Sequence, residues 1–461
     1  MNKLDIIEGY YNFHFIGIGG VNMSGLAEIL YKEGYFVTGS DKNLSEAVER
    51  LKKVGVDVKI GHDAQNVSDD TQVVVYNAAI SENNPEIVMA KSKNLRLMDR
   101  AELLGRLMQN YGTAICVAGS HGKTTVTSML AMIFMSAQTD PTVMSGGILP
   151  AMGGAMRIGK RDVFIAEACE YHNSFLKLFP DIALVLNMEM DHSDYFSDVN
   201  ALEHSFHGFA ERVPADGMLV INGQIEGLQQ IIKGLDCNIC VFGEGGDIWA
   251  ENISFNDLGC GSFDACDKSG KIGRISLAVP GEYNIQNAIA AIACALHFGI
   301  DFDMIARGLK DFTGANRRFQ RMGYCNGAVV IDDYAHHPTE VAVTIRAAKN
   351  IPHDRLWAVF QSHTNTRTLE FLEEFADSLA LADEIIVLDI FNPAGREEEG
   401  CPVHAGDLVD KIRSYKPNCR YLPGFDEAAE FLMENVKPDD MIIIMGAGSV
   451  GELARRITAK I

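Results

Sequence analysis

The 461-residue chain is short of positive charge, of cysteine and of long apolar runs, and each shortage excludes a class of protein. It carries 40 Lys and Arg against 62 Asp and Glu, which gives a formal net charge of −22. Nucleic acids and anionic membranes repel so acidic a protein, so neither is expected as its main partner. With 47% hydrophobic and 22% charged residues, the chain is typical of a globular enzyme and too apolar for disorder.

No apolar run approaches the roughly 20 residues that a helix needs to cross a bilayer. The longest runs, 288–296 and 441–445, predict one buried helix and one buried strand. The first residues contain neither the basic nor the apolar segment of a secretory signal, so we expect a cytoplasmic protein with no stable membrane insertion. Ten scattered cysteines predict reduced, buried thiols, and the lone C-x-x-C pair, Cys237 and Cys240, is weak evidence for metal or redox use.

Three times the sequence starts a buried strand, a glycine-bearing turn and a helix, near residues 13, 114 and 329. Strands alternate with helices after each start, and the pattern predicts among others a strand at 73–76 and helices near 338–348, 367–381 and 425–435. This alternation is typical of parallel sheets, and the length favours two to four domains. We therefore predict an α/β protein of three domains, 1–112, 113–314 and 315–461, each a mainly parallel sheet flanked by helices. The Gly- and Asp-rich region 236–275 predicts a β-hairpin excursion inside the middle domain.

The second start carries the strongest motif, Gly119-Ser120-His121-Gly122-Lys123-Thr124-Thr125. Small residues between a strand and a helix let backbone N–H groups turn toward phosphate oxygens, and the helix N-terminus adds positive potential. Lys123 would reach the β- and γ-phosphates of ATP, and a threonine hydroxyl would bind Mg²⁺. The longer Walker A pattern requires a glycine in place of Val117, so the match is to the shorter G-x-x-G-K-T-T form. A merely structural turn is the weaker alternative.

The first start carries a less specific turn, Gly17-Ile18-Gly19-Gly20. A dinucleotide fingerprint has a third glycine where this chain has Asn22, although Asp41 lies near the usual place of the acidic residue. The residues alone leave three alternatives open: a diphosphate site, a nicotinamide site and a tight turn without a ligand.

Candidate metal ligands follow two strands of the middle domain. Glu167 ends the strand VFIAE, and Asp191 and His192 follow the strand ALVLN, so they are expected at the carboxyl edge of one sheet. A carboxylate and an imidazole there could hold Mg²⁺ beside the phosphate loop. Glu170 competes with Glu167 for this role, and a capping glutamate with an isolated surface histidine is the structural alternative.

The last candidates flank the start of the third domain. Asn284 and Asn287 share one face of an Ala-rich helix, where they could read an adenine edge, although helix capping is the more ordinary role. The pair Arg317-Arg318 could clamp a phosphate, and an aspartate at a strand end could accept ribose hydroxyls. Surface ion pairs and helix caps are the alternatives. The segment 362–367 could bind a small carboxylate at a helix N-terminus.

Together these motifs resemble the Mur ligases. The matching stretches cover most of the chain: HFIGIGGVNMSGLAEIL (14–30), GSHGKTT (119–125), AEACEYHNSFL (166–176), NMEMDH (187–192), GEYNIQNAIAA (281–291), RRFQ (317–320), DDYAHHPTE (332–340) and FQSHTNTRT (360–368). The glycine loop alone marks the wider superfamily, and the first and seventh stretches narrow the resemblance to members that act on the muramate first.

The resemblance implies a Rossmann-like UDP-sugar domain, a P-loop ATPase domain and a Rossmann-like C-terminal domain that closes with the amino acid. The implied activity is ATP-dependent ligation of L-alanine to the lactyl carboxylate of UDP-N-acetylmuramate through an acyl phosphate. This is a step of peptidoglycan synthesis, and so of cell-wall biogenesis, cell shape and cell division. ATP and Mg²⁺ are the implied cofactors, no nucleic acid is involved, and we expect a monomer or weak homodimer.

The same resemblance assigns residues to these ligands. The UDP-sugar contacts are Gly17, Gly19, Gly20, Val21, Asn22, Met23, Ser24 and Asp41. The ATP contacts are Gly119, Ser120, His121, Gly122, Lys123, Thr124, Thr125, Asn284, Asn287, Arg318 and Asp333. The metal ligands are Thr124, Thr125, Glu167 and His192, the amino-acid contacts are His336 and Arg367, and the catalytic groups are Lys123, His192, Arg318 and His336.

The chain departs from the family's pattern in two places, and three other functions remain as alternatives to the implied one. Many members have A-D-E-S-D-A-S-F where this chain has ACEYHNSF (168–175), two acids fewer, so the outer metal shell is expected to differ. The carbamoylated lysine of related ligases has no counterpart that we can place.

The group that deprotonates the amine is open between His336, Asp332 and Asp333. The alternatives are a ligase that attaches a murein tripeptide to the same sugar nucleotide, a nicotinamide-dependent dehydrogenase and a non-catalytic ATP-binding protein.

Overall fold

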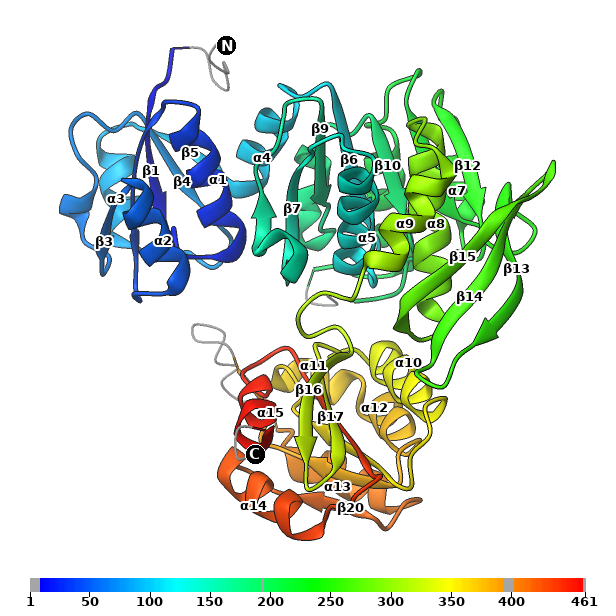
Figure 1. The fold of residues 1–461 in the computed structure, drawn as a ribbon. Coiled ribbons are helices and arrows are strands. Elements are labelled where there is room, and N and C mark those ends of the chain that lie inside the picture. The colour runs from blue at the N-terminus through cyan, green and yellow to red at the C-terminus, as the bar shows by residue number, and fades with distance from the viewer. Residues whose placement is uncertain (1–8, 192–194, 393–401, 459–461) are drawn as a thin grey trace. The chain divides into compact units, whose positions relative to one another are not determined.

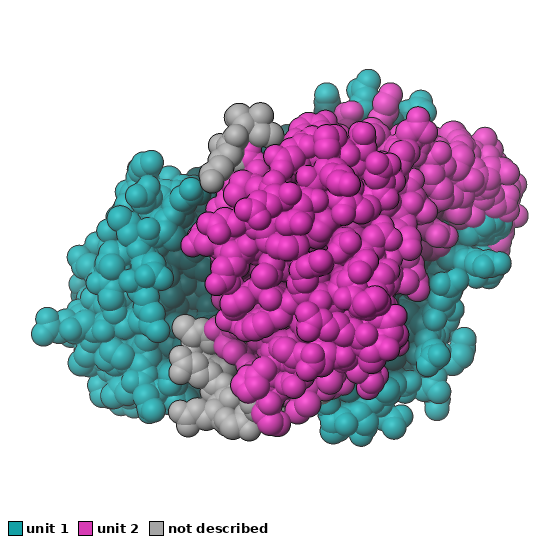
Figure 2. All heavy atoms as spheres, turned by 90° about the horizontal axis from the view of Figure 1, so that it is seen from below, with its two compact units in different colours: residues 1–249, 290–308 teal, residues 250–289, 309–461 magenta. Residues whose placement is uncertain are grey.

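The computed structural model describes residues 9–191, 195–392 and 402–458, which form three mainly parallel sheets flanked by helices (Figure 1). Contacts divide the chain into two compact units, residues 1–249 with 290–308 and residues 250–289 with 309–461 (Figure 2). The dividing line falls within β13 (Ile248–Phe255), within α8 (Tyr283–His297) and near the end of α9 (Phe302–Asp311). The predicted α/β class with three sheets is confirmed, whereas the predicted domain boundaries stay a prediction.

The first sheet has five parallel strands in the order β3-β2-β1-β4-β5. Its strands are β1 (Asn12–Ile16), β2 (Phe36–Asp41), β3 (Asp57–Ile60), β4 (Val73–Tyr76) and β5 (Arg96–Asp99). Its helices are α1 (Val21–Lys32), α2 (Glu46–Val54), η1 (Ala64–Asn66), α3 (Pro85–Ser92) and α4 (Arg100–Met108). The strand order reverses beside β1, and a reversal of this kind is where open α/β sheets bind ligands.

The second sheet, within the first unit, runs in the order β12-β11-β10-β6-β9-β7-β8. Its strands are β6 (Thr113–Ala118), β7 (Thr142–Leu149), β8 (Gly154–Arg157), β9 (Val163–Glu167), β10 (Ile182–Val185), β11 (Met218–Asn222) and β12 (Asn238–Phe242). Only β8 is antiparallel to its neighbour. The other elements of this part are α5 (Lys123–Ser136), η2 (Pro150–Met152), η3 (Tyr171–Lys177), α6 (Val199–Ala210) and α7 (Leu228–Ile232). The phosphate-loop motif thus follows a strand in the middle of the sheet.

The second unit contains a β-hairpin and the third sheet. The hairpin pairs β14 (Cys260–Asp267) with β15 (Gly270–Pro280). The third sheet has the order β16-β17-β21-β18-β19-β20, and only β16 is antiparallel. Its strands are β16 (Gln320–Cys325), β17 (Ala328–Asp333), β18 (Leu356–Phe360), β19 (Glu384–Val387), β20 (Cys419–Tyr421) and β21 (Met441–Met445). Its helices are α10 (Pro338–Lys349), α11 (Asn365–Glu370), α12 (Leu372–Leu379), α13 (Ala405–Arg413), α14 (Phe425–Asn435) and α15 (Gly451–Thr458), and apolar clusters cover both faces of the sheet.

Several expectations are confirmed and two need correction. The run 441–445 is a buried strand, and the described cysteines are free thiols, most of them buried. The helix expected at 367–381 is two helices, because Phe371 has a non-helical backbone between them. The hairpin expected over 236–275 begins later, since β12 runs parallel to β11. None of the helices described here has the length and apolar composition that crossing a membrane requires.

A buried carboxylate at the start of β21 makes a testable contribution to stability. Asp440 accepts hydrogen bonds from Arg355 Nη2 at 2.6 Å, Lys437 N at 3.0 Å and Trp357 Nε1 at 3.1 Å. Burial raises the pKa of Asp440, but these bonds outweigh burial and hold the pKa below its ordinary value of 3.8. The ionised carboxylate therefore stabilises the fold above pH 3.8, and this contribution is lost as the pH falls through the folded-state pKa.

We expect Asp440→Asn to lower the free energy of unfolding by about 1.5–3 kcal/mol at pH 7, since a hydrogen-bonded charge is removed from the interior. The difference from the unmodified chain shrinks on acidification below pH 3.8. Urea unfolding at several pH values measures both effects. Asp426→Asn, at the exposed ion pair with Arg456, is the matched control and costs at most about 1 kcal/mol. If the loss of unfolding free energy in Asp440→Asn does not change with pH, the ionised Asp440 carboxylate is not the group that stabilises the fold.

Candidate functional site

The phosphate-loop motif connects β6 to α5, and two of its glycines have positive φ angles. Gly119 has a φ of +138°, and a Cβ there would lie 3.2 Å from Asn187 N. Gly122 has a φ of +84° at the N-cap of α5. L side chains rarely adopt such angles, so the backbone conformation of the loop depends on glycine. The predicted order of strand, glycine loop and helix is confirmed.

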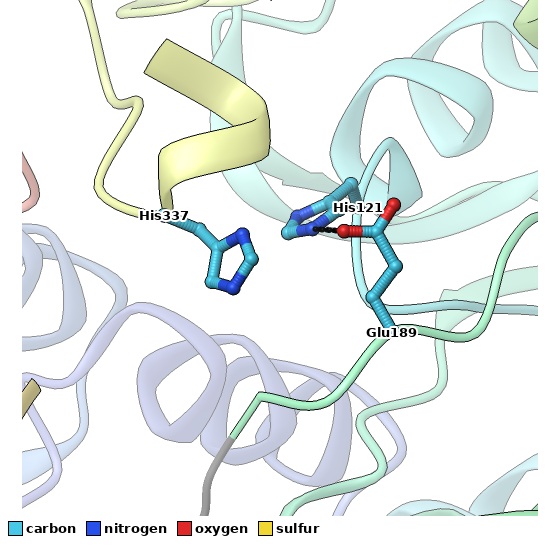
Figure 3. Close-up of side chains that lie close together, drawn as sticks. All are labelled: His121, Glu189 and His337. Atoms are coloured by element: carbon cyan, nitrogen blue, oxygen red, sulfur yellow. Dashed lines mark ion pairs between the residues drawn. The ribbon is translucent and has the colours of Figure 1, made fainter. Parts of the chain in front are cut away.

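The loop is held by the segment that follows β10. Asn187 accepts from His121 N at 2.8 Å and donates to His121 O at 3.1 Å. The Ser120 hydroxyl accepts from Glu189 N at 2.9 Å, and the His121 ring forms an ion pair with Glu189 at 3.3 Å (Figure 3). Sequence reasoning missed Asn187 and Glu189 as supports, although both lie in the stretch NMEMDH. The loop is therefore braced from a neighbouring strand end.

Lys123 lies at the start of α5, and its ammonium group is already engaged. Lys123 Nζ donates to Gly119 O, to Ser120 O at 3.2 Å and to the Glu170 carboxylate at 3.0 and 3.2 Å. Burial lowers the pKa of Lys123, but the adjacent Glu170 carboxylate outweighs burial and raises it. Lys123 therefore stays charged at neutral pH, as phosphate binding requires.

The two glutamates that compete as metal ligands have different partners. Glu167 Oε1 accepts from Ser145 Oγ at 3.1 Å and from Gly146 N, whereas buried Glu170 faces Lys123. Thr124, at the start of α5, is buried as well. Hydroxyl and carboxylate oxygens are the ligands that Mg²⁺ prefers, so the chemistry of these side chains fits the ion. His192 lies outside the described residues.

The backbone of Gly146 lies against the Glu167 carboxylate. A Cβ at Gly146 would lie 2.8 Å from Glu167 Oε2, closer than a methyl group tolerates. We therefore expect Gly146→Ala to displace the carboxylate and to weaken binding of Mg²⁺-ATP by about 10-fold, the lower end for loss of a group that orients a metal site. Calorimetric titration with Mg²⁺-ATP measures the affinity without turnover.

The control for this variant is Gly208→Ala on α6, where the nearest atom to a new Cβ is a Leu176 side-chain carbon at 3.5 Å. We expect it to leave the affinity unchanged. Unchanged affinity in a folded Gly146→Ala protein contradicts a role for the Glu167 position in holding the ion.

The first turn follows β1, and its backbone is held by residues at the end of β2. Ser40 O accepts from Gly17 N at 2.8 Å and from Ile18 N at 2.9 Å, and Asp41 Oδ2 accepts from Gly19 N at 2.8 Å. Asp41 therefore supports the turn itself. Among the described side chains none caps α1, so the first N–H groups of this helix point outward, as anion binding at a helix N-terminus needs.

The predicted contacts at the start of α1 differ in exposure. Val21 is exposed, whereas Met23 belongs to the core and Ser24 is buried with its hydroxyl donating to Val21 O at 3.1 Å. The side chains of Met23 and Ser24 thus face the interior of the protein. A ligand at this helix start meets their main chain only.

A buried polar network under this turn was missed by sequence reasoning. Glu86 accepts from Ser40 Oγ at 2.6 Å and Asn66 Nδ2 at 2.7 Å, and lies 3.3 Å from His14 Nε2. Burial raises the pKa of Glu86, but the bonds from His14, Ser40 and Asn66 outweigh burial and lower it. The only sequence signal is a polar residue in each of two apolar strands. The network fixes the end of β2, on which the turn depends.

At the third sheet the paired arginines have separate roles. Arg317 donates to Gly446 O at 2.5 Å, to Gly448 O at 2.9 Å and to Asp332 at 3.2 Å, so its guanidinium stabilises the fold. The Arg318 guanidinium lies over the Tyr334 ring, 5.2 Å from its centroid. Of the two, Arg318 is therefore the better candidate for contact with a phosphate.

The two aspartates that end β17 are both engaged with donors of the protein. Asp333 accepts from Phe319 N at 2.6 Å and from Ala335 N at 2.8 Å. Burial raises the pKa of Asp333 to about 6, against the opposing effect of Arg318. Asp332 pairs with Arg317, and burial raises its pKa too. These bonds fix both carboxylates in place.

Three of the remaining predicted residues lie on helices, as expected from the sequence. Asn287 Nδ2 donates to Asn284 Oδ1 at 3.1 Å, which confirms that the two amides share a face of α8. Arg367 lies in α11, whose N-cap Thr364 accepts from Arg367 N at 3.4 Å. The predicted helix N-terminus after β18 is therefore present.

The chain matches the three parts of one enzyme family in order. Residues 12–112 match the catalytic domain of the Mur ligase family, residues 117–295 the Mur ligase middle domain and residues 317–448 the Mur ligase glutamate ligase domain. The UDP-N-acetylmuramate–L-alanine ligase of Agathobacter rectalis is 44% identical over 462 residues, with 100% of both chains covered. That of Clostridium tetani is 44% identical over 449 residues, covering 97% of this chain and 98% of its own length.

Solved structures agree with these relatives. The UDP-N-acetylmuramate-alanine ligase of Thermotoga maritima aligns with a TM-score of 0.82 at 25% identity, covering 97% of this chain and 98% of its own. A murein peptide ligase of Psychrobacter arcticus aligns with a TM-score of 0.72 at 25% identity over the same shares. With full-length relatives at 44% identity and family matches in all three parts, the chain belongs to the Mur ligase family.

Proposed function

We propose that this enzyme joins L-alanine to the lactyl carboxylate of UDP-N-acetylmuramate at the expense of ATP, in the cytoplasmic stage of peptidoglycan synthesis. The observation that carries the proposal is the full-length similarity to relatives named for this reaction. The braced phosphate loop with its charged lysine supports ATP as the phosphoryl donor. Domain boundaries at 112–113 and 314–315 belong to the same proposal.

The chemistry follows from the weakness of a carboxylate as an electrophile. The lactyl carboxylate takes the γ-phosphoryl group of ATP, and the amine of L-alanine then displaces phosphate from the acyl phosphate. Lys123 and Arg318 neutralise charge on the transferring group, so that catalysis is mainly positioning and electrostatics. Mg²⁺, held by Thr124 or Thr125 with Glu167 or Glu170 and His192, supplies further positive charge when bound.

The remaining residues are assigned to binding. The backbone of 17–24, supported by Asp41, receives the UDP diphosphate. Asn284 and Asn287 contact adenine, Asp333 contacts ribose, and the loop 119–125 with Lys123 contacts the phosphates. His336 and Arg367 receive L-alanine.

The nearest competing function is attachment of a preformed peptide to the same sugar nucleotide. The similarity to the Psychrobacter arcticus murein peptide ligase favours it as the second candidate, although its TM-score of 0.72 is below the 0.82 of the alanine ligase. Competition between L-alanine and murein tripeptide for the same enzyme separates the two.

Phosphate release with UDP-N-acetylmuramate, ATP and each amino acid in turn tests the proposal. We expect L-alanine to support turnover and Lys123→Ala to lower kcat by about 10²–10³-fold, the usual cost of removing one group that stabilises transition-state charge. Lys310→Ala, at an exposed lysine of α9, is the control. Absence of ADP with every amino acid, or tripeptide turnover alone, sinks the alanine assignment.

A further inference from the structure

The ring of His336 is held on one side by two oxygen atoms. His336 Nδ1 lies 3.0 Å from Tyr334 O and 3.1 Å from Glu340 Oε2. The same Glu340 oxygen accepts from the main-chain N–H of His336 at 3.0 Å and of His337 at 3.4 Å. Glu340 is the third residue of α10 and completes its capping box. One carboxylate therefore fixes both the backbone and the ring of His336.

These contacts determine which ring nitrogen carries the hydrogen. A main-chain carbonyl oxygen only accepts hydrogen bonds, and an ionised carboxylate likewise. The start of a helix favours negative charge on Glu340. Nδ1, which faces two acceptors, therefore carries the hydrogen in the neutral ring, and Nε2 carries the lone pair.

The surroundings of His336 connect it to the amino-acid end of the site. Its ring lies 6.1 Å, centroid to centroid, from the ring of His363, which begins the stretch leading into α11. Helix α11 carries Arg367, assigned above to L-alanine. Asp332 and Asp333, the other candidate bases, are fixed by Arg317 and by main-chain N–H groups.

We propose that Glu340 is a positioning residue for the amide-forming step, which holds His336 so that Nε2 accepts a proton from the ammonium group of the incoming amino acid. This inference rests on the proposed function. Transfer of one proton to Nε2 leaves a neutral amine and an imidazolium, which the Glu340 carboxylate stabilises at Nδ1.

The amine nitrogen then attacks the acyl carbon. The C–N bond forms, the C–O bond to phosphate breaks, and the electron pair leaves with inorganic phosphate. The second amine proton passes to the departing phosphate, and Nε2 returns its proton to solvent. Atoms and charges balance without any further reactant.

Glu340→Gln tests the role because the glutamine oxygen still accepts the main-chain N–H groups of the cap. We expect kcat with L-alanine to fall about 10–100-fold, as is usual when a group that orients a functional histidine is lost. The KM values for ATP and L-alanine and the melting temperature stay within experimental error. Glu427→Gln is the matched control, because Glu427 caps α14 by accepting from Gly424 N at 3.2 Å, and we expect full activity.

A nucleophile that is already neutral separates this role from a structural one. Hydroxylamine needs no base at neutral pH and converts an acyl phosphate to a hydroxamate. We expect Glu340→Gln to form hydroxamate from UDP-N-acetylmuramate and ATP at the rate of the unmodified enzyme. Equal losses with hydroxylamine and L-alanine overturn the positioning role. No hydroxamate from the unmodified enzyme overturns the proposed function instead.

The tautomer is measurable without any variant of Glu340. Nitrogen-15 spectra of the full-length chain, with the His336 signals identified by their loss in His336→Asn, distinguish a protonated from an unprotonated ring nitrogen. We expect hydrogen on Nδ1. Hydrogen on Nε2 in the neutral ring overturns the proposal even if Glu340→Gln fails to fold.

Discussion

Backbone N–H groups at the carboxyl ends of parallel strands must be turned and held, and the candidate site depends on how this chain holds them. In each of the three sheets, residues at or just beyond the end of one strand hold the main chain of a nearby loop. Asn187, after β10, holds His121, and Ser40, at the end of β2, holds Gly17. In the third sheet Asp333, at the end of β17, holds Phe319 and Ala335. The same constraint thus holds three loops, and the UDP diphosphate and the ATP phosphates are assigned to two of them, whereas Asn284, Asn287 and Arg367 lie on helices.

The elements of this fold could be predicted from local pattern. Short apolar runs indicate the buried strands, and the pattern predicts the bounds of β4 and α14 to the residue. The glycine loop was identifiable because a positive φ restricts residue type at Gly119 and Gly122. The split of α11 from α12 was not predictable, since it comes from the backbone at Phe371 and from no helix-breaking residue type.

What could not be predicted are the pairings between distant residues. Glu170 meets Lys123 across 47 positions of sequence, and Glu86 meets Ser40 across 46. Arg317 and Arg318 are adjacent and alike in sequence, yet a φ of +58° at Arg317 and its carbonyl partners give them separate roles. Such differences arise only when the chain is folded, because each depends on a second segment.

The ion pair between Lys123 and Glu170 has a consequence for how an anion binds to so acidic a chain. The net charge of −22 repels nucleotides, so attraction must be local, and the lysine that supplies it is already bound to a carboxylate. A triphosphate that contacts Lys123 exchanges one ion pair for another and releases few counterions from the lysine. Its affinity is then a difference between two similar interactions, with a shallow dependence on salt. Glu170 therefore competes with the ligand for Lys123, which favours ligands that carry more negative charge than one carboxylate.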